Sequence, residues 1–253
     1  MKALITGATS GIGKCIAENL HNHGWKLILT GRNEKVLKKM QRDFGNNTEI
    51  IKAELSDRNE VFKVYEFCKD KNIDLLVNNA GYGIFGKFDE TDLDDELSMI
   101  DVNITALHIL TKLFLRDFKK RDRGYILNVA SVAGFMTGPL LSSYYASKNY
   151  VIRLSSAIYE ELKHEHSNVK ITVLCPGPVN TNFNNRAGVS FSMKPASPEY
   201  VADYALKTLF RGKFFAIPLF TTKVCAIGQR FVPERLLSII TYHIQKAKKN
   251  NNI

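Results

Sequence analysis

The amino-acid sequence predicts an α/β fold in which about seven parallel strands form one doubly wound sheet with helices on both faces. Short apolar runs alternate with amphipathic segments almost throughout the chain. The runs are nearly continuous in apolar residues, as expected of strands buried on both faces. A length of 253 residues with 45% hydrophobic and 24% charged residues suits one globular α/β domain and excludes wholesale disorder.

Strands are expected where short runs rich in β-branched or aromatic residues are bounded by turn residues. These runs are Lys2–Thr6, Lys26–Thr30, Thr48–Lys52, Ile73–Val77, Tyr125–Val129, Val169–Cys175 and Phe214–Ile217. Apolar residues at helical spacing predict helices between them, over Gly11–His23, Glu34–Phe44, Asn59–Lys69, Leu93–Lys120, Ser142–His164 and Pro198–Phe210. Gly24 and Gly45 are expected to end helices, and Asn33 and Ser197 to cap helix starts.

A change in composition divides the chain into a domain over residues 1–217 and a basic C-terminal extension over residues 218–253. Pro233 suits the first turn of a helix. Apolar residues then recur at helical spacing at Leu236, Ile239, Ile240, His243, Ile244 and Ala247, with basic residues largely off that stripe. Two interpretations stay open: the stripe packs on the domain or a neighbouring subunit, or it lies on an anionic membrane.

The formal charge of +10 is concentrated near the C-terminus, where nine Lys and Arg residues from Lys207 onward stand against one acid. No nucleic-acid-binding motif accompanies this charge, so no nucleic-acid partner is expected. No apolar stretch reaches the roughly 18 residues of a spanning helix, and no signal peptide is expected. The four cysteines are scattered without a CxxC pair, which predicts a cytoplasmic protein without disulfides or a bound metal.

A glycine-rich turn follows the first strand and precedes a helix: Thr6-Gly7-Ala8-Thr9-Ser10-Gly11-Ile12-Gly13. Glycines let backbone N–H groups approach a pyrophosphate, which binds at the positive end of the helix. Any tight turn from a strand into a helix can use glycine. The strand before it and the helix after it nevertheless favour a dinucleotide site.

The end of the second strand indicates which dinucleotide binds. In such domains an acid about 20 residues past the glycine turn binds the ribose 2′-hydroxyl and selects NAD. Here Gly31 holds that place, and Arg32 follows it. A guanidinium suits a 2′-phosphate, so the pattern predicts NADP(H), with a solvated surface arginine as the alternative.

Proton-transfer chemistry is indicated by Tyr144 and Lys148, which lie four residues apart on one face of a predicted helix. A phenol has a pKa near 10, and a nearby cation is expected to lower that pKa towards the working range. The hydroxyl of Ser131 could hydrogen-bond a carbonyl oxygen that gains negative charge. Tyr145 is turned about 100° around the helix from Tyr144 and is expected to point elsewhere.

Further short motifs follow the glycine turn in a fixed order. They are Asn78-Asn79-Ala80-Gly81, Asp101-Val102-Asn103, Asn128-Val129-Ala130-Ser131, Tyr144-Tyr145-Ala146-Ser147-Lys148 and Pro176-Gly177-Pro178-Val179-Asn180-Thr181. In this order they make the chain from Lys2 to about Phe210 resemble the single-domain branch of the short-chain dehydrogenase/reductase family. The resemblance implies a Rossmann-type fold and an NADP(H)-dependent oxidoreductase acting on a carbonyl or a secondary alcohol.

The resemblance also implies residue roles. Tyr144 would be the general acid/base, Lys148 would hold the nicotinamide ribose and lower the pKa of Tyr144, Ser131 would orient the substrate oxygen, and Asn103 would support a proton relay. Glu54 takes the place of an aspartate that meets the adenine amine in the family. The implied cofactor contacts are Gly7, Thr9, Ser10, Gly11, Ile12, Gly13, Arg32, Glu54, Leu55, Asn79, Ala80, Gly81, Tyr144, Lys148, Pro176, Gly177, Val179 and Thr181.

The substrate is expected to be a hydrophobic ketone, aldehyde or acyl compound. In the family the stretch over residues 182–196 is a lid on the substrate, and here it contains Phe183. Ser131, Phe135 and Phe183 are the candidate substrate contacts. The helices predicted over Leu93–Lys120 and Ser142–His164 match a family pair that forms a four-helix contact, so we expect a homodimer or homotetramer. A non-catalytic dinucleotide-binding regulator is the alternative, which the intact set of Ser131, Tyr144 and Lys148 disfavours.

Overall fold

A computed structural model describes residues 1–181 and 195–249 and confirms the predicted fold class. One sheet of seven parallel strands has the order β3-β2-β1-β4-β5-β6-β7. Its strands are β1 (Lys2–Thr6), β2 (Lys26–Gly31), β3 (Thr48–Lys52), β4 (Leu75–Asn78), β5 (Tyr125–Val129), β6 (Lys170–Leu174) and β7 (Phe215–Ala216). The chain reverses its direction across the sheet between β1 and β4, and ligands of such sheets bind beside that point.

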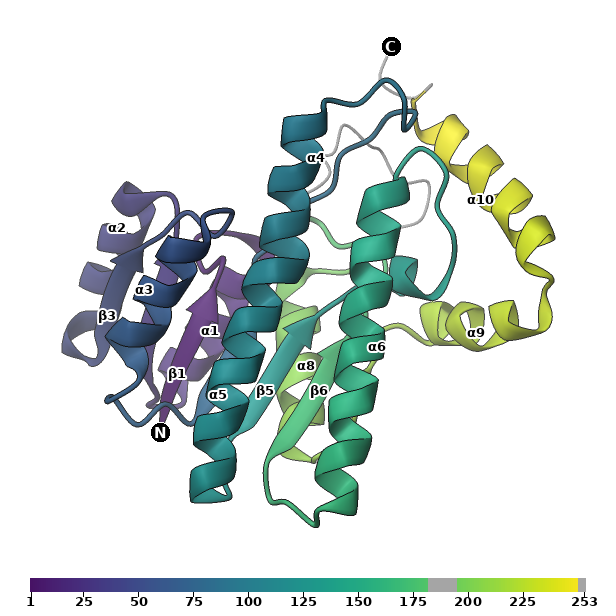
Figure 1. The fold of residues 1–253 in the computed structure, drawn as a ribbon. Helices are drawn as coiled ribbons and strands as arrows, with labels where there is room; N and C mark the ends of the chain where they lie inside the picture. Colours follow the sequence, from purple (N-terminus) through teal and green to yellow (C-terminus); the bar gives the residue numbers. More distant parts are fainter. Residues whose placement is uncertain (182–194, 250–253) are drawn as a thin grey trace.

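Helices cover both faces of the sheet (Figure 1). The main helices are α1 (Gly11–Asn22), α2 (Glu34–Phe44), α3 (Arg58–Cys68), α4 (Leu93–Ile100), α5 (Leu107–Arg121), α6 (Ser142–His164), α8 (Pro198–Phe210), α9 (Phe220–Gly228) and α10 (Glu234–Lys249). Shorter turns are η1 (Gly45–Asn47), η2 (Asp101–Ala106), η3 (Val132–Phe135) and η4 (Gln229–Phe231).

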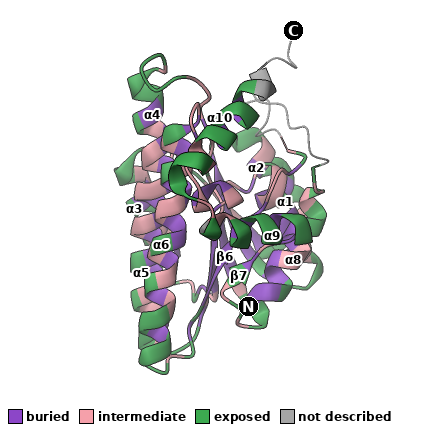
Figure 2. Ribbon diagram, turned by 90° about the vertical axis from the view of Figure 1, so that its right-hand side faces the viewer, coloured by how far each residue is buried: buried purple, intermediate pink, exposed green. Residues whose placement is uncertain are grey.

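Two apolar cores lie on opposite faces of the sheet, because successive strand side chains alternate in direction. On β1, Ile5 faces the core that packs against α1, α2 and α8, whereas Leu4 faces the core under α3, α5 and α6. Figure 2 shows the strands buried between helices whose outer sides are exposed. This packing fixes where each strand ends and therefore where the loops of the site begin.

Capping residues and glycines in the sequence correctly predicted several of the helix ends. The side chain of Asn33 accepts from the N–H of Val36 at 3.1 Å, and Ser197 accepts from the N–H of Tyr200 at 3.2 Å, so both predicted helix caps are confirmed. Gly24 follows the end of α1 with φ +76°, a conformation that suits glycine. Two differences concern helices: α9 was not expected, and the helix predicted over Leu93–Lys120 is interrupted by the π-helical turn η2.

The helical stretch Leu93–Arg121 is long and apolar enough to cross a membrane by length and composition alone. In the structure 44% of its most apolar part is buried, and Phe114 and Phe118 pack in the core under α3, α5 and α6. This stretch therefore serves as a core helix of the domain.

The C-terminal extension leaves the domain after β7 and returns to it. In Figure 1, α9 leads outward and α10 runs back alongside the segment that precedes α6. The hydroxyls of Ser238 on α10 and Thr137 in that segment are hydrogen-bonded at 2.6 Å. This return brings α10 to the end of the sheet where the carboxyl ends of the strands lie.

Candidate active site

A cleft of about 540 Å³ lies at the carboxyl ends of the strands. Residues of the glycine turn, of the loops after β2, β3, β4, β5 and β6, of α6 and of α10 line it. The lining includes every implied cofactor contact except Gly13: Gly7, Thr9, Ser10, Gly11, Ile12, Arg32, Glu54, Leu55, Asn79, Ala80, Gly81, Tyr144, Lys148, Pro176, Gly177, Val179 and Thr181. Residues more than 170 positions apart in the chain thus share one cavity.

The glycine turn forms an anion cradle at the start of α1. Gly7 has φ +62°, and a Cβ there would lie 2.9 Å from the Cα of Ala80. The first turn of α1, which the structure describes in full, carries no acidic residue, and the hydroxyl of Ser10 does not cap it. The N–H groups at a helix start and the positive end of its dipole suit a pyrophosphate, so these residues fit a dinucleotide.

Gly13 and Asn79 hold the glycine turn in shape, and Asn79 also lines the cleft. The amide of Asn79 donates to the carbonyl oxygens of Thr6 at 3.0 Å and of Gly7 at 3.1 Å. A Cβ on Gly13 would lie 2.3 Å from the Nδ2 atom of Asn79. Gly13 is therefore needed for the close packing of α1 on Asn79, and it is not among the described residues that line the cleft.

Arg32 and Glu54 face each other where the adenosine end of a dinucleotide would lie. Their side chains form an ion pair at 3.5 Å, and both are about half exposed. A Cβ on Gly31 would lie 3.1 Å from the methyl group of Thr9, so this position has little room for the acid that selects NAD. The Arg32 guanidinium thus lies in the cleft, paired with the Glu54 carboxylate.

The part of the cleft away from Arg32 and Glu54 brings together Ser131, Tyr144 and Lys148. The side chains of Ser131 and Tyr144 are hydrogen-bonded, and Ser131 also accepts from the N–H of Ala133 at 3.2 Å. The ammonium of Lys148 donates to the carbonyl oxygen of Val129 at 3.0 Å and lies 5.8 Å from the centre of the Tyr144 ring. The start of α6 and the end of β5 thus bring these three side chains to one place.

Burial shifts the proton equilibria of this group. Burial raises the pKa of Tyr144 above its ordinary value, and the hydrogen bond with Ser131 opposes that rise. Burial lowers the pKa of Lys148 to about 8. Lys148 is not among the causes of the Tyr144 shift, so the expectation that it lowers this pKa is not met here, and desolvation of the phenol is the largest cause. A protonated phenol is the form that can donate a proton to a carbonyl oxygen.

Asn103 is buried in η2 and does not itself line the cleft. Its amide accepts from the N–H of Tyr82 at 3.0 Å and donates to the carbonyl of Tyr82 at 2.9 Å and to the hydroxyl of Ser147 at 3.0 Å. A Cβ on Gly81 would lie 2.9 Å from its Oδ1 atom. Asn103 therefore joins the loop after β4 to α6, and the irregular turn η2 places it there.

Two expectations about the substrate end need correction. Tyr145 also lines the cleft, and its ring stands edge-on to that of Tyr144 at 6.1 Å, because the cleft wraps around the start of α6. Phe135 is not among the described lining residues and instead packs against Phe215, with ring centres 5.8 Å apart. Phe183 lies outside the described residues.

The contribution of α10 to the cleft was not predicted. Ile244 lines the cleft, and the buried amide of Gln245 donates to the hydroxyl of Tyr145. In the sequence, this contact is indicated by the polar residue Gln245 within the amphipathic C-terminal segment. A second missed feature is a buried chain of hydrogen bonds in which Asn78 donates to Asn128 at 2.9 Å and Asn128 donates to Ser155 at 3.0 Å. It anchors the ends of β4 and β5 to α6.

Fold and site together define a nicotinamide-dependent oxidoreductase of the Rossmann type. A family model described as short chain dehydrogenase matches residues 1–189, and the chain belongs to this short-chain dehydrogenase/reductase family. The protein is therefore similar in sequence to enzymes that transfer hydride to or from NAD(P).

Two curated relatives agree with this assignment. The chain is 32% identical over 213 residues to an uncharacterized oxidoreductase of Staphylococcus saprophyticus, covering 82% of this chain and 90% of that protein. It is 29% identical over 198 residues to dehydrogenase/reductase SDR family member 7B of Mus musculus, covering 73% and 59%.

Solved structures share the fold. A short-chain dehydrogenase from Sphingobium yanoikuyae in complex with NADPH has a TM-score of 0.82 at 27% identity, covering 93% of this chain and 94% of that one. A serine dehydrogenase complexed with NADP⁺ has a TM-score of 0.74 at 29% identity, covering 82% and 88%. A Burkholderia phymatum structure in complex with NAD, at 23% identity and a TM-score of 0.81 over 91% and 92%, shows the shared fold alone.

Proposed function

We propose that this protein is an NADP(H)-dependent reductase of a hydrophobic ketone, aldehyde or acyl compound, reversible as an alcohol dehydrogenase. The observation that carries the proposal is the buried, hydrogen-bonded pair of Ser131 and Tyr144 beside Lys148, in the same cleft as the anion cradle. When bound, the nicotinamide supplies or accepts the hydride. The remaining work falls to the side chains of this chain.

In the direction of reduction, Ser131 and Tyr144 donate hydrogen bonds to the carbonyl oxygen, and the proton of Tyr144 moves to that oxygen as negative charge develops there. Lys148 holds the ribose of the cofactor, and its charge favours the phenolate that the proton transfer leaves behind. Asn103 acts through its neighbours, holding the loop at Tyr82 and the start of α6 in register.

Apolar and aromatic side chains around the substrate end support a hydrophobic substrate. Met136, Leu141, Tyr145 and Ile244 line the cleft there. The test is a panel of carbonyl compounds of increasing alkyl length with NADPH, read as loss of NADPH absorbance. A non-catalytic regulator would bind NADPH and turn over no member of the panel.

Arg32 is expected to select NADPH. A charge-assisted hydrogen bond contributes about 1.5–3 kcal/mol, so kcat/KM with NADPH should exceed that with NADH about tenfold to a hundredfold. Arg32→Asp should abolish or reverse this ratio. Glu54→Gln should raise it up to about fivefold, because it removes a half-exposed carboxylate that pairs with Arg32. Equal kcat/KM with both cofactors in the unchanged protein would refute the role of Arg32.

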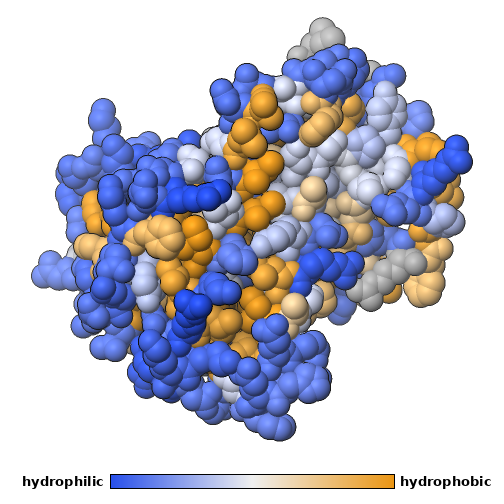
Figure 3. All heavy atoms as spheres, in the orientation of Figure 1, coloured by the Kyte–Doolittle hydropathy of each residue, from blue (hydrophilic) through white to orange (hydrophobic). Residues whose placement is uncertain are grey.

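We propose in addition that α4, α5 and α6 form a contact between subunits of a homodimer or homotetramer. Figure 3 shows apolar side chains gathered on the outer surface over α4 and α5. On α4, Leu93 and Leu97 are exposed by 68% and 48%. Light scattering at micromolar concentration should give two or four times the chain mass of 28.6 kDa. A mass of one chain would count against this contact.

A further inference from the structure

Helix α10 presents polar side chains to the domain and apolar side chains to solvent. Its inward residues Thr241 and Gln245 are only 4% and 1% exposed. Its outward residues Leu236, Ile239, Ile240 and Ile244 are 44% to 51% exposed. A helix on a globular domain ordinarily has the opposite arrangement, with its apolar stripe on the core. Leu236, Ile239 and Ile240 of the predicted stripe are therefore turned towards solvent, whereas Ile244 also borders the cleft.

Helix α9 has the same inverted arrangement. Thr222 and Ala226 face inward and are 4% exposed each, whereas Phe220, Val224 and Ile227 are exposed by 80%, 52% and 52%. Phe231, just past α9, is 84% exposed. These outward residues recur at helical spacing and form one stripe. We call the outward residues of α9 and α10, with Phe231, the C-terminal apolar face. Figure 3 shows apolar atoms along the right-hand edge, over these helices.

The charge around the C-terminal apolar face indicates whether a second copy of the chain or a lipid surface covers it. Residues 218–253 contain six Lys and Arg residues and one acid, Glu234. Lys223, Arg235 and Lys246 are exposed beside the apolar residues. In a two-fold symmetric dimer the same patch meets itself, so a second copy would oppose these cations to one another. An anionic lipid surface attracts them and also accepts the apolar side chains.

We propose that α9 and α10 bind to the surface of an anionic lipid bilayer, with the C-terminal apolar face inserted between the headgroups. The attachment is reversible and peripheral, because it uses exposed side chains of two short helices and a modest number of charges.

The position of Ile244 gives this attachment a consequence for substrate entry. Ile244 belongs to the C-terminal apolar face and also lines the cleft. The substrate end of the cleft therefore lies beside the proposed bilayer surface, so a carbonyl compound dissolved in the lipid has a short path to Tyr144. This consequence rests on the proposed reductase activity, whereas the binding itself does not.

Vesicle sedimentation of the full chain tests the binding without reference to activity. The probe is phosphatidylcholine mixed with phosphatidylserine, compared with phosphatidylcholine alone. We expect at least about tenfold stronger partitioning onto the anionic vesicles, from several cations that each contribute about 1 kcal/mol. Raising the salt from about 0.1 M to about 1 M shortens the screening length from about 10 Å to about 3 Å and should release the protein.

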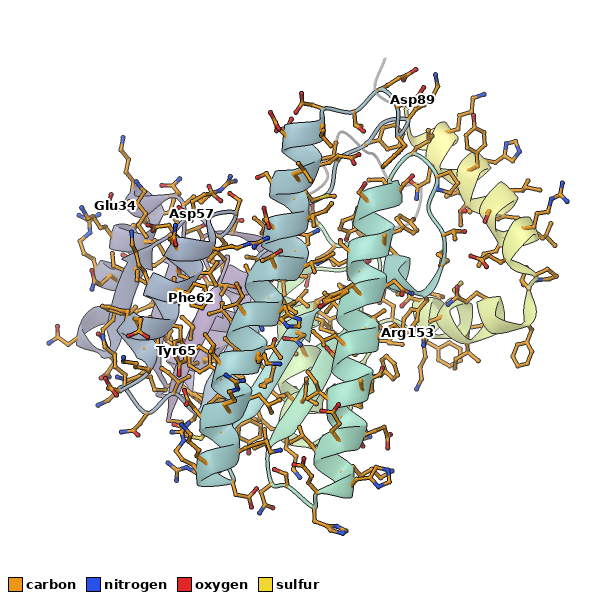
Figure 4. All side chains as sticks on the ribbon, viewed as in Figure 1. Glu34, Asp57, Phe62, Tyr65, Asp89 and Arg153 are labelled. Atoms are coloured by element: carbon orange, nitrogen blue, oxygen red, sulfur yellow. The ribbon has the colours of Figure 1, made fainter. Side chains whose placement is uncertain are left out.

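A double variant with a matched control tests the assignment to this face. Phe220→Glu with Phe231→Glu should weaken partitioning at least about tenfold, because it replaces two exposed apolar groups with anions. The control Phe62→Glu changes a phenylalanine on α3 that is 47% exposed and lies on the far side of the domain from α9 and α10 (Figure 4). It should bind like the unchanged protein. Thermal melting checks that each variant is folded.

Three results would overturn the proposal. One is an unchanged protein that does not bind the anionic vesicles. Another is equal binding by the double variant, or equal loss in the control. The third is a lower mass by light scattering for the double variant than for the unchanged protein, together with no vesicle binding by the unchanged protein. That result would assign the C-terminal apolar face to a contact with a second copy of the chain.

Discussion

Tyr144→Phe is expected to lower kcat by about 10²–10⁴-fold while leaving the Kd for NADPH within a few-fold of the unchanged value. The substitution removes only the hydroxyl that is hydrogen-bonded to Ser131. The ring remains to fill its place in the cleft, so packing and cofactor binding are preserved. Turnover of the best compound in the carbonyl panel and titration of NADPH binding measure the two quantities separately.

Tyr145→Phe is the matched control, because both rings line the cleft at 6.1 Å from each other. Loss of that hydroxyl breaks the hydrogen bond from Gln245 and should raise KM more than it lowers kcat. A reversed pair of results, with Tyr144→Phe near full turnover and Tyr145→Phe inactive, would transfer the acid/base role to Tyr145.

The residues of the cofactor cleft could be predicted because their positions follow from local sequence and a single topological rule. Gly7, Arg32 and Asn79 each follow a strand, and each of those strands is predicted from a short apolar run of its own. Parallel strands all end at one edge of their sheet, so those loops converge there whatever the details of packing. The same rule brought Ser131 and Thr181 to the cleft from much later in the chain.

The substrate end was less predictable, because it depends on contacts between distant parts of the chain. The hydrogen bond from Gln245 to Tyr145 joins residues 100 positions apart, and no local pattern reports the path that α10 takes back to the domain. Phe135 was assigned to the pocket by its place between Ser131 and Tyr144, yet the turn η3 directs it towards Phe215. The direction in which the Tyr144 pKa shifts likewise depends on how deeply the phenol is buried. The spacing of residues on a helix does not predict that burial.

Lys148→Met is expected to abolish turnover and yet to stabilise the folded protein without cofactor. Lys148 is 4% exposed, and its burial lowers its pKa to about 8 from an ordinary 10.5. Lowering a pKa by one corresponds to about 1.4 kcal/mol against the charged form in the fold. Loss of the hydrogen bond to Val129 offsets about 1 kcal/mol of the gain. The lowering of about 2.5 corresponds to roughly 3 kcal/mol, so a net gain of about 2 kcal/mol at pH 7 should raise Tm by about 4–8 °C.

The stabilisation by Lys148→Met depends on pH, because the folded and unfolded chains release the Lys148 proton at different pH. Between pH 8 and pH 10.5 the unfolded chain binds a proton at Lys148 that the folded protein has released, so the stability of the unchanged protein should rise over that range. The advantage of Lys148→Met is therefore full below about pH 8 and disappears above about pH 10.5. Thermal melting across this range measures it. The exposed Lys14→Met, which breaks only an ion pair with Glu18 at 3.5 Å, is the control and should change stability by less than about 0.5 kcal/mol.

A lower Tm for Lys148→Met at pH 7 would show that the buried ammonium is a structural element of the fold. A higher Tm together with lost turnover would show the reverse. Residues that weaken the fold at the position where they act are typical of functional sites, because function and stability then place opposite demands on the same side chain. A buried ammonium that costs stability, beside a phenol hydrogen-bonded to Ser131, is better accounted for by catalysis than by packing.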